Sequence, residues 1–147
     1  MTNQIDSLKN GKLIYLSSKI CMTGDLGLHQ NMFGGVLLSF LDENSAIFAC
    51  EICDSTAMVT RCIDKVEFEK PVKAGQIIKI YGGIDRIGNT SITLNMEIRK
   101  HNVHTEAELL VLRTKITFVK IDDDGSPIPI SDRIKTKFGF MKKEETK

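Results

Sequence analysis

The sequence predicts an α+β fold in which one antiparallel sheet curls around a single long helix. An apolar segment from Val36 to Ile52 is long enough for about five turns of helix. After Ser55 the chain is divided into segments of strand character with only short turns between them. Strands joined by short turns pair antiparallel, and a sheet that wraps the apolar helix buries both elements.

The expected elements follow the chain as one strand, one helix and four strands. The first strand is Lys12 to Ile20, and a loop from about Met22 to Met32 leads to the helix. The later strands are expected at 59–68, 76–87, 91–99 and 109–121. The pattern is clearest from Ile92 to Ile98, where every second residue is apolar and the residues between are polar.

Length, composition and charge exclude several classes of function. The 147 residues are expected to form one domain, 1–147, and a net charge of +1 gives no field that attracts a polyanion. No Trp and only two Tyr leave little for base stacking, so nucleic acid is not expected as a partner. No leader or membrane-spanning run is present, which favours a cytoplasmic protein without a membrane partner.

The tail and the cysteines suggest no further chemistry. Residues 131–147 are basic and compatible with a short helix, and we expect their end, KKEETK, to be frayed. Cys50 and Cys53 have Cys-x-x-Cys spacing, but Cys21 and Cys62 do not complete a zinc-ligand pattern. Buried thiols in a reducing cytosol are expected, with no metal and no cofactor.

The candidate site begins in HQNMFGGVLLSFLDENSA, residues 29–46. Gly34 and Gly35 lie where the helix must begin. Because they have no side chains, they leave the unpaired N–H groups of the first turn open to approach. These groups and the helix dipole favour negative charge, including charge that develops during a reaction. Alternatively, the glycines only permit close packing or a tight turn.

Asp42 follows Gly35 by seven residues, so both lie on nearly the same helical face. Its apolar flanks make an unpaired charge costly, and a carboxylate kept there has either a partner or a role in chemistry. The alternative is a solvated patch shared with Glu43 and Asn44. Seven residues rise about 10 Å, too far for Gly35 and Asp42 of one helix to act on one carbon. If both act, two antiparallel subunits of a symmetric dimer share the site.

Four short motifs occur in order along the chain: Phe33-Gly-Gly35-Val-Leu-Leu-Ser-Phe-Leu-Asp42, Val66-Glu-Phe68-Glu-Lys-Pro71-Val-Lys-Ala-Gly75, Gly88-Asn-Thr-Ser91 and Thr117-Phe118-Val119. In sequence and spacing they resemble the bacterial hotdog-fold acyl-CoA thioesterases. The resemblance covers about residues 12–125. The hotdog fold, a sheet wrapped around a central helix, has the same order of elements as predicted above.

The resemblance implies hydrolysis of an acyl-CoA thioester to the free acid and CoA, with CoA as part of the substrate. In such enzymes an acid at the position of Asp42 is the general base or the nucleophile, and the helix start, here Gly34-Gly35, polarises the thioester carbonyl. Substrate would lie in a dimer interface beside Phe33, and dimers would assemble further, as a trimer of dimers, into a hexamer.

The resemblance also implies that the pantetheine arm passes the turn from Gly88 to Ser91. Arg86, Asn89, Thr90 and Ser91 cluster at this turn and are candidates for binding CoA phosphates or pantetheine amides. The alternative is a solvated hairpin turn.

The sequence departs from the family at one place. Many members carry Asn six residues before the Phe, in a segment Asn-x-x-Gly, whereas this chain has Gly27 there and Gln30 at the second Gly. His29 and Asn31 are nearby candidates to orient water or the carbonyl, or are loop residues without a role. Two other functions stay open: a non-catalytic acyl-CoA sensor, and a hotdog-fold dehydratase of hydroxyacyl thioesters, a class that pairs a His with an acid.

Overall fold

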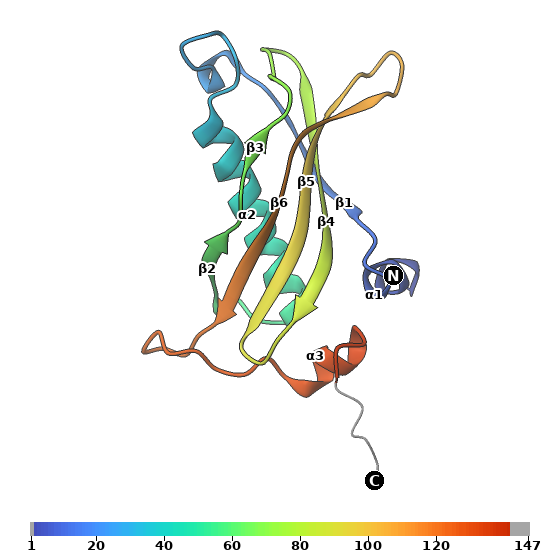
Figure 1. Ribbon diagram of the computed structural model, residues 1–147, viewed down its shortest axis with the longest axis vertical. Coiled ribbons are helices and arrows are strands. Elements are labelled where there is room, and N and C mark those ends of the chain that lie inside the picture. Colours follow the sequence, from blue (N-terminus) through green and yellow to red (C-terminus); the bar gives the residue numbers. More distant parts are fainter. Residues whose placement is uncertain (1, 142–147) are drawn as a thin grey trace.

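The computed structural model describes residues 2–141. In chain order the elements are α1 (Thr2–Lys9), β1 (Ile14–Ile20), the 3₁₀ turn η1 (Thr23–Asp25), α2 (Gly34–Cys53), β2 (Met58–Ile63), β3 (Glu67–Phe68), β4 (Ile77–Ile87), β5 (Ser91–His101), β6 (Glu108–Lys120) and α3 (Asp132–Lys137). Figure 1 shows one curved sheet beside the long helix α2, with α1 and α3 near one end of the sheet.

The sheet is antiparallel throughout, as predicted. Its strand order is β1-β4-β5-β6-β2, and the short β3 pairs with β6 beyond the end of β2. β1 therefore forms one edge, and β2 with β3 forms the other. The three long strands β4, β5 and β6 lie in the middle, where their alternating apolar side chains face α2.

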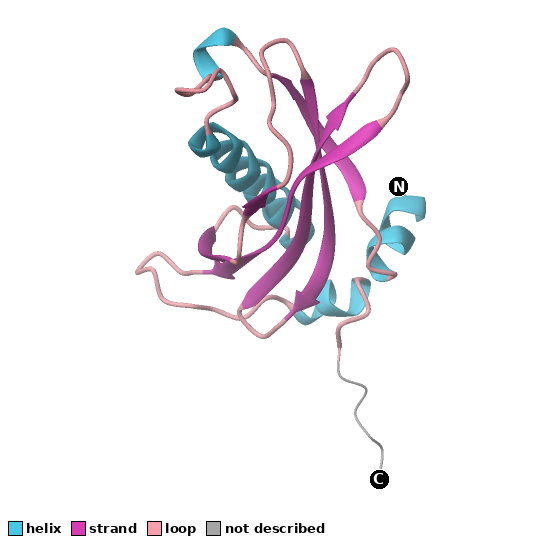
Figure 2. Ribbon diagram, turned by 45° about the horizontal axis from the view of Figure 1, so that its top comes forward, coloured by secondary structure: helices cyan, strands magenta, loops and turns pink. Residues whose placement is uncertain are grey.

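Helix α2 lies across the concave face of the sheet (Figure 2). The residues that it buries recur every three or four positions: Leu37, Leu41, Ser45, Phe48, Ala49, Ile52 and Cys53. The sequence predicts a helix covered on most sides, and this is wrong for the single chain. Ile47, on the opposite face, is 52% exposed, because one curved sheet reaches only one side of a helix.

Two features of the secondary structure differ from the prediction. The expected strand 59–68 is divided into β2 and β3, because a bulge between Thr60 and Cys62 bends the chain before residue 64. Helix α1 was not predicted, since its sequence TNQIDSLK has no continuous apolar stripe. The basic tail does contain a short helix, α3, whereas KKEETK, residues 142–147, lies outside the described residues.

The sheet face turned away from α2 carries a charged network centred on Glu97. The Glu97 side chain is 10% exposed and accepts hydrogen bonds from Arg99 Nε at 2.8 Å and Arg113 Nε at 2.7 Å. Burial alone would raise the pKa of this carboxyl, but the hydrogen bonds and charges of the two arginines outweigh burial and hold the pKa below its ordinary value. The network explains how a charged residue is kept in the middle of the sheet.

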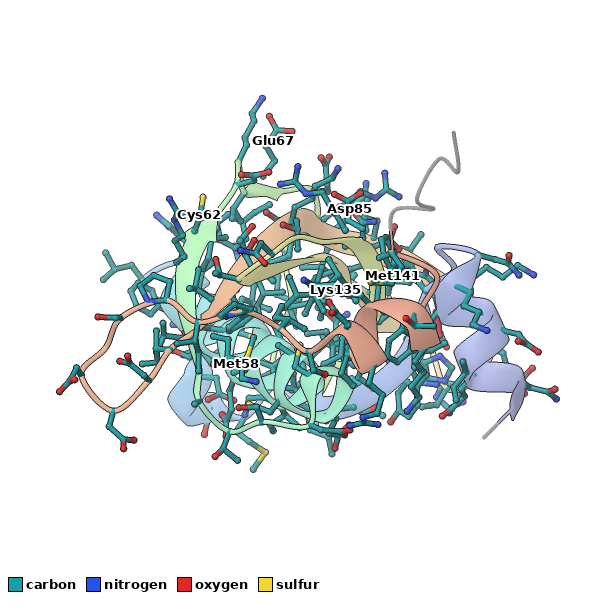
Figure 3. All side chains as sticks on the ribbon, turned by 90° about the horizontal axis from the view of Figure 1, so that it is seen from below. Met58, Cys62, Glu67, Asp85, Lys135 and Met141 are labelled. Carbon is teal, nitrogen blue, oxygen red and sulfur yellow. The ribbon has the colours of Figure 1, made fainter. Side chains whose placement is uncertain are left out.

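All four cysteines are free. The expectation of buried thiols is correct for Cys21 and Cys53, and burial raises the pKa of Cys53 to about 11. It is wrong for Cys62, which is exposed on the edge strand β2, whereas Met58 of the same strand points toward α2 (Figure 3). Within residues 2–141, no helix is long and apolar enough to cross a membrane.

Candidate active site

Helix α2 begins without a side-chain cap. Phe33 is its N-cap residue, in an extended conformation, and its carbonyl oxygen accepts from the N–H groups of Val36 at 2.9 Å and Leu37 at 3.3 Å. Among residues 2–141, the N–H groups of Gly34 and Gly35 have no acceptor. Two donors therefore point out of the positive end of a 20-residue helix, an arrangement that attracts an oxygen carrying negative charge.

Two aromatic rings flank the glycines. A side-chain carbon on Gly35 would lie 2.7 Å from Cε1 of Phe33, and one on Gly34 would lie 3.2 Å from Cζ of Phe68. Both rings are largely exposed, Phe33 to 60% and Phe68 to 51%. The glycines therefore permit close packing, and at the same time their N–H groups stay free of hydrogen bonds to the described residues.

Asp42 is half-buried on α2, between the fully buried Leu41 and the exposed Glu43. Its Oδ1 accepts a hydrogen bond from Oγ1 of Thr60 at 2.7 Å. Thr60 belongs to β2 and shares with Met58 the strand face turned to α2, immediately before the bulge at Arg61. Asp42 is thus a carboxylate held in place by one neutral donor.

The loop before α2 is closed by its own backbone. Gly27 N–H donates to Asn31 O at 2.7 Å, and Gln30 N–H donates to Gly27 O at 3.2 Å. Gln30 has φ +58°, a left-handed conformation that favours glycine. Gln30 thus adopts a backbone conformation that glycine favours, at the position where the resembling family carries the Gly of its Asn-x-x-Gly segment.

The two polar candidates of this loop lie on different sides of the helix start. His29 is exposed and lines a hollow of about 720 Å³ with residues 24–30, Phe33 and Val36, which we call the loop hollow. The side-chain oxygen of Asn31 accepts from Lys73 Nζ. Within residues 2–141, neither His29 nor the Asn31 side chain is hydrogen-bonded to Asp42.

A second hollow, of about 540 Å³, lies on the other side of the helix start, and we call it the Phe68 hollow. Its lining residues are Asn31, Met32, Gly34, Leu37, Phe68, Lys70, Pro71 and Val72. Met32, Leu37 and Val72 belong to the buried core, so this hollow is floored by apolar side chains.

One further carboxylate, Asp25, lines the loop hollow, but it is already engaged. It accepts a hydrogen bond from the N–H of Met22 at 2.9 Å and pairs with Lys19 Nζ at 3.0 Å. The hydrogen bond from Met22 and then the one from Lys19 hold the pKa of Asp25 below its ordinary value. Asp25 is therefore a structural anion of the loop. In the described part of the chain, no three or more His, Cys, Asp or Glu side chains gather in a way that could hold a metal ion.

The turn from Gly88 to Ser91 lies far from the helix start within one chain. It joins β4 to β5 at the end of the sheet beside α3, whereas α2 begins at the opposite end (Figure 1). The turn is fixed by its backbone: Gly88 N–H donates to Ser91 O, Ile130 N–H to Asn89 O and Lys120 N–H to Thr90 O, all between 2.8 and 2.9 Å. Arg86 is exposed.

Sequence reasoning missed two residues at the site, Thr60 and Phe68. Thr60 is 18 residues from Asp42, and only the position of β2 against α2 brings them together. Phe68 stands in one of the family-like motifs, but its position over Gly34 depends on the short β3 pairing with Leu112 of β6. Neither contact has a signal in residue spacing.

Comparisons with known proteins identify the family and the fold. A family model described as thioesterase superfamily matches residues 29–107. The acyl-CoA thioester hydrolase YciA of Salmonella typhimurium is 30% identical over 131 residues, which are 86% of this chain and 95% of that protein. An uncharacterized acyl-CoA thioester hydrolase of Bacillus subtilis is 28% identical over 106 residues, 72% of this chain but 61% of the relative's own length.

Among solved structures, a hexameric hotdog fold thioesterase of Campylobacter jejuni is similar with a TM-score of 0.76 and 34% identity. The match covers 86% of this chain and 96% of that one. The family model, the near-complete alignment with the Salmonella relative and the shared architecture place the chain in one group: it belongs to the thioesterase superfamily and has the hotdog fold.

Proposed function

We propose that the protein hydrolyses acyl-CoA thioesters to the free acid and CoA, and that Asp42, Gly34 and Gly35 carry the reaction. The main observation in support is that two N–H groups at the start of α2 have no acceptor among residues 2–141, on the helix that also presents Asp42. The relatives that match this chain bear the name acyl-CoA thioester hydrolase.

The N–H groups of Gly34 and Gly35 suit the thioester carbonyl oxygen. Attack on the carbonyl carbon converts this oxygen to an oxyanion, and the two donors gain most at that moment because they are fixed in advance by the helix. Removing one such donor from an enzyme typically costs about 3–4 kcal/mol of transition-state stabilisation.

Asp42 has two possible roles that lead to the same products. As a general base it removes a proton from water, the hydroxide adds to the carbonyl carbon, and the tetrahedral intermediate expels CoA as a thiolate. As a nucleophile it attacks the carbon itself, expels the CoA thiolate and leaves a mixed anhydride that water then hydrolyses. In both cases the hydrogen bond from Thr60 leaves one oxygen of Asp42 to react.

Each site is then shared between two subunits. Gly35 and Asp42 are separated by about 10 Å of helix, so the glycines of one chain act with Asp42 of a partner. The exposed edge strand β2 carries Thr60, and pairing of this edge with a second copy would bring two α2 helices together. The hexameric state of the Campylobacter relative supports association of such dimers as a trimer of dimers.

The same assembly gives a role to the turn from Gly88 to Ser91. It lies at the opposite end of its own chain from Gly34, so an antiparallel partner would bring its turn toward this helix start. We therefore assign Arg86 and this turn to the pantetheine and phosphates of CoA bound at the partner's glycines. His29 and Asn31 are assigned to water or carbonyl orientation on the two sides of the helix start.

The test is the release of free thiol from a panel of acyl-CoAs by the wild type and by Asp42→Ala, with acyl-CoA binding measured in parallel. Hydrolysis by the wild type, and its loss in Asp42→Ala with binding retained, is the expected result. Binding of acyl-CoA without hydrolysis by the wild type would indicate a non-catalytic acyl-CoA sensor and contradict the proposed enzyme. Hydrolysis that persists in Asp42→Ala would keep the enzyme but remove Asp42 from the reaction.

A further inference from the structure

A bound acyl-CoA has two arms, the acyl group and the pantetheine, and one hollow lies on each side of the helix start. With the carbonyl oxygen at the N–H groups of Gly34 and Gly35, the acyl group and the pantetheine leave the carbonyl carbon in different directions. Phe33 lines the loop hollow and Gly34 lines the Phe68 hollow, so the helix start lies between them. Each arm therefore has a hollow available to it.

The chemistry of the linings decides which arm enters which hollow. The Phe68 hollow is floored by the buried apolar side chains of Met32, Leu37 and Val72, which suit a hydrocarbon. The loop hollow is also lined by apolar side chains, but Leu28 and Phe33 among them are 96% and 60% exposed, so a hydrocarbon there would stay in contact with water. The exposed His29 of this hollow instead offers a hydrogen bond to an amide of pantetheine. The acyl group therefore belongs in the Phe68 hollow.

Phe68 stands where the acyl group would enter this hollow. A carbonyl oxygen lies about 2.9 Å from the nitrogen that donates to it, and its carbon about 1.2 Å beyond. The next acyl carbon therefore falls within about 4–5 Å of Gly34 N. The Phe68 ring borders this position, since it lines the same hollow as Gly34 and its Cζ lies 3.2 Å from the position of a side-chain carbon on Gly34.

We propose that Phe68 sets the acyl selectivity of the protein: its ring limits the space at the carbon next to the thioester carbonyl, so unbranched acyl groups are accepted and α-branched ones are rejected. This inference rests on the proposed function. The Phe68 ring packs beside Gly34 but supplies no reacting group, and it lies on β3, a strand of two residues that pairs with β6, whereas Gly34, Gly35 and Asp42 are held by helix α2. Replacing its side chain therefore leaves Gly34, Gly35 and Asp42 in place.

The experiment compares n-butyryl-CoA with isobutyryl-CoA, two isomers that differ only in branching at this carbon. The wild type is expected to prefer the unbranched isomer in kcat/KM. Phe68→Ala is expected to raise the ratio of isobutyryl to n-butyryl kcat/KM by at least tenfold, since one methyl group in a hydrophobic site typically changes discrimination by 10–200-fold. Phe68→Leu, which keeps part of the bulk, is expected to give an intermediate ratio.

The ratio is measured on one preparation of each variant, so a loss of folded protein cancels. Tyr15→Ala is the matched control, because it removes another exposed aromatic side chain from the opposite edge of the sheet. An unchanged ratio in Phe68→Ala would overturn the proposal, as would an equal change in Tyr15→Ala. If Phe68→Ala and Phe68→Leu hydrolysed neither isomer, the proposal would also be overturned, because the ring would then be needed for hydrolysis itself. No hydrolysis by the wild type would instead contradict the proposed function.

Discussion

The hydrogen bond from Thr60 to Asp42 gives the sharpest test of how the carboxylate is positioned. Thr60→Val replaces a hydroxyl with a methyl group of nearly the same size, so the packing of β2 against α2 is kept. The 2.7 Å bond to Asp42 Oδ1 is lost. Asp42 then keeps its charge but can rotate away from the orientation in which its second oxygen faces water or the carbonyl.

The expected magnitude follows from the nature of this hydrogen bond. A hydrogen bond to a charged group contributes about 1.5–3 kcal/mol. Thr60 donates from a neutral hydroxyl, and the second oxygen of Asp42 is left to the reaction, so we use the lower end of that range. About 1.4 kcal/mol corresponds to a tenfold change in rate. We therefore expect kcat to fall about tenfold, with KM little changed because the CoA contacts are untouched.

The assay is steady-state thiol release with butyryl-CoA, reported as kcat and KM separately. Thr60→Ser keeps the hydroxyl and is expected to retain most activity. Thr117→Val is the matched control, because the hydroxyl of Thr117 is 2.9 Å from that of Thr93 on the sheet face away from α2. A wild-type kcat in Thr60→Val, or an equal loss in Thr117→Val, would refute the positioning role of Thr60.

Three further predictions concern the scaffold. Glu97→Gln is expected to lower the free energy of unfolding at pH 7 by on the order of 2 kcal/mol, whereas Glu67→Gln, whose ion pair with Lys65 is exposed, changes it by less than about 0.5 kcal/mol. The pKa of Glu97 is lower in the folded than in the unfolded state. Glu97 therefore contributes to the free energy of unfolding above the ordinary carboxyl pKa of about 4.3, and this contribution is lost as pH falls through the pKa of the folded state. Urea unfolding at pH 7 and at successively lower pH checks this, and a difference between wild type and Glu97→Gln that does not shrink as pH falls below about 4.3 would contradict it. Gln30→Val is expected to be at least about 1 kcal/mol less stable than Gln30→Gly, because φ +58° suits glycine and strains a β-branched residue. Equal melting temperatures of the two variants would argue against a left-handed residue 30. Alkylation of native protein at pH 8 is expected to modify Cys62 first and Cys53 last, since Cys62 is exposed and burial raises the pKa of Cys53 to about 11. Mass spectrometry of peptides gives the order, and early labelling of Cys53 would contradict it.

The sequence predicted the elements whose signal is periodic. The apolar spacing of α2 and the alternation of β5 each describe a buried face, and the short turns between β4, β5 and β6 determine the antiparallel pairing. Helix α1 has no such stripe, and the break between β2 and β3 comes from a bulge at Arg61 that adds one residue without changing composition. Neither helix α1 nor the break between β2 and β3 could be predicted, because neither changes the hydrophobic pattern of the sequence.

The candidate site was predicted where it lies on one helix. Gly34, Gly35 and Asp42 are close in sequence, so helical geometry alone relates them. Thr60 and Phe68 reach the same place only through the packing of β2 and β3, which one sequence does not specify. The turn at Gly88 was assigned to the site by resemblance, and a single chain leaves it at the far end of the sheet.

The separation of seven residues from Gly35 to Asp42 on α2 has a consequence for the activity of mixed assemblies. In the proposed arrangement every chain contributes its glycines to one site and its Asp42 to another, so no site is complete within a single chain. Chains without the carboxylate and chains without a usable helix start are each inactive alone, yet a mixed pair contains one site with both halves intact. Dilution then reduces the rate more steeply than chain concentration, because the catalytic unit is the pairing of two chains and not the folded chain itself.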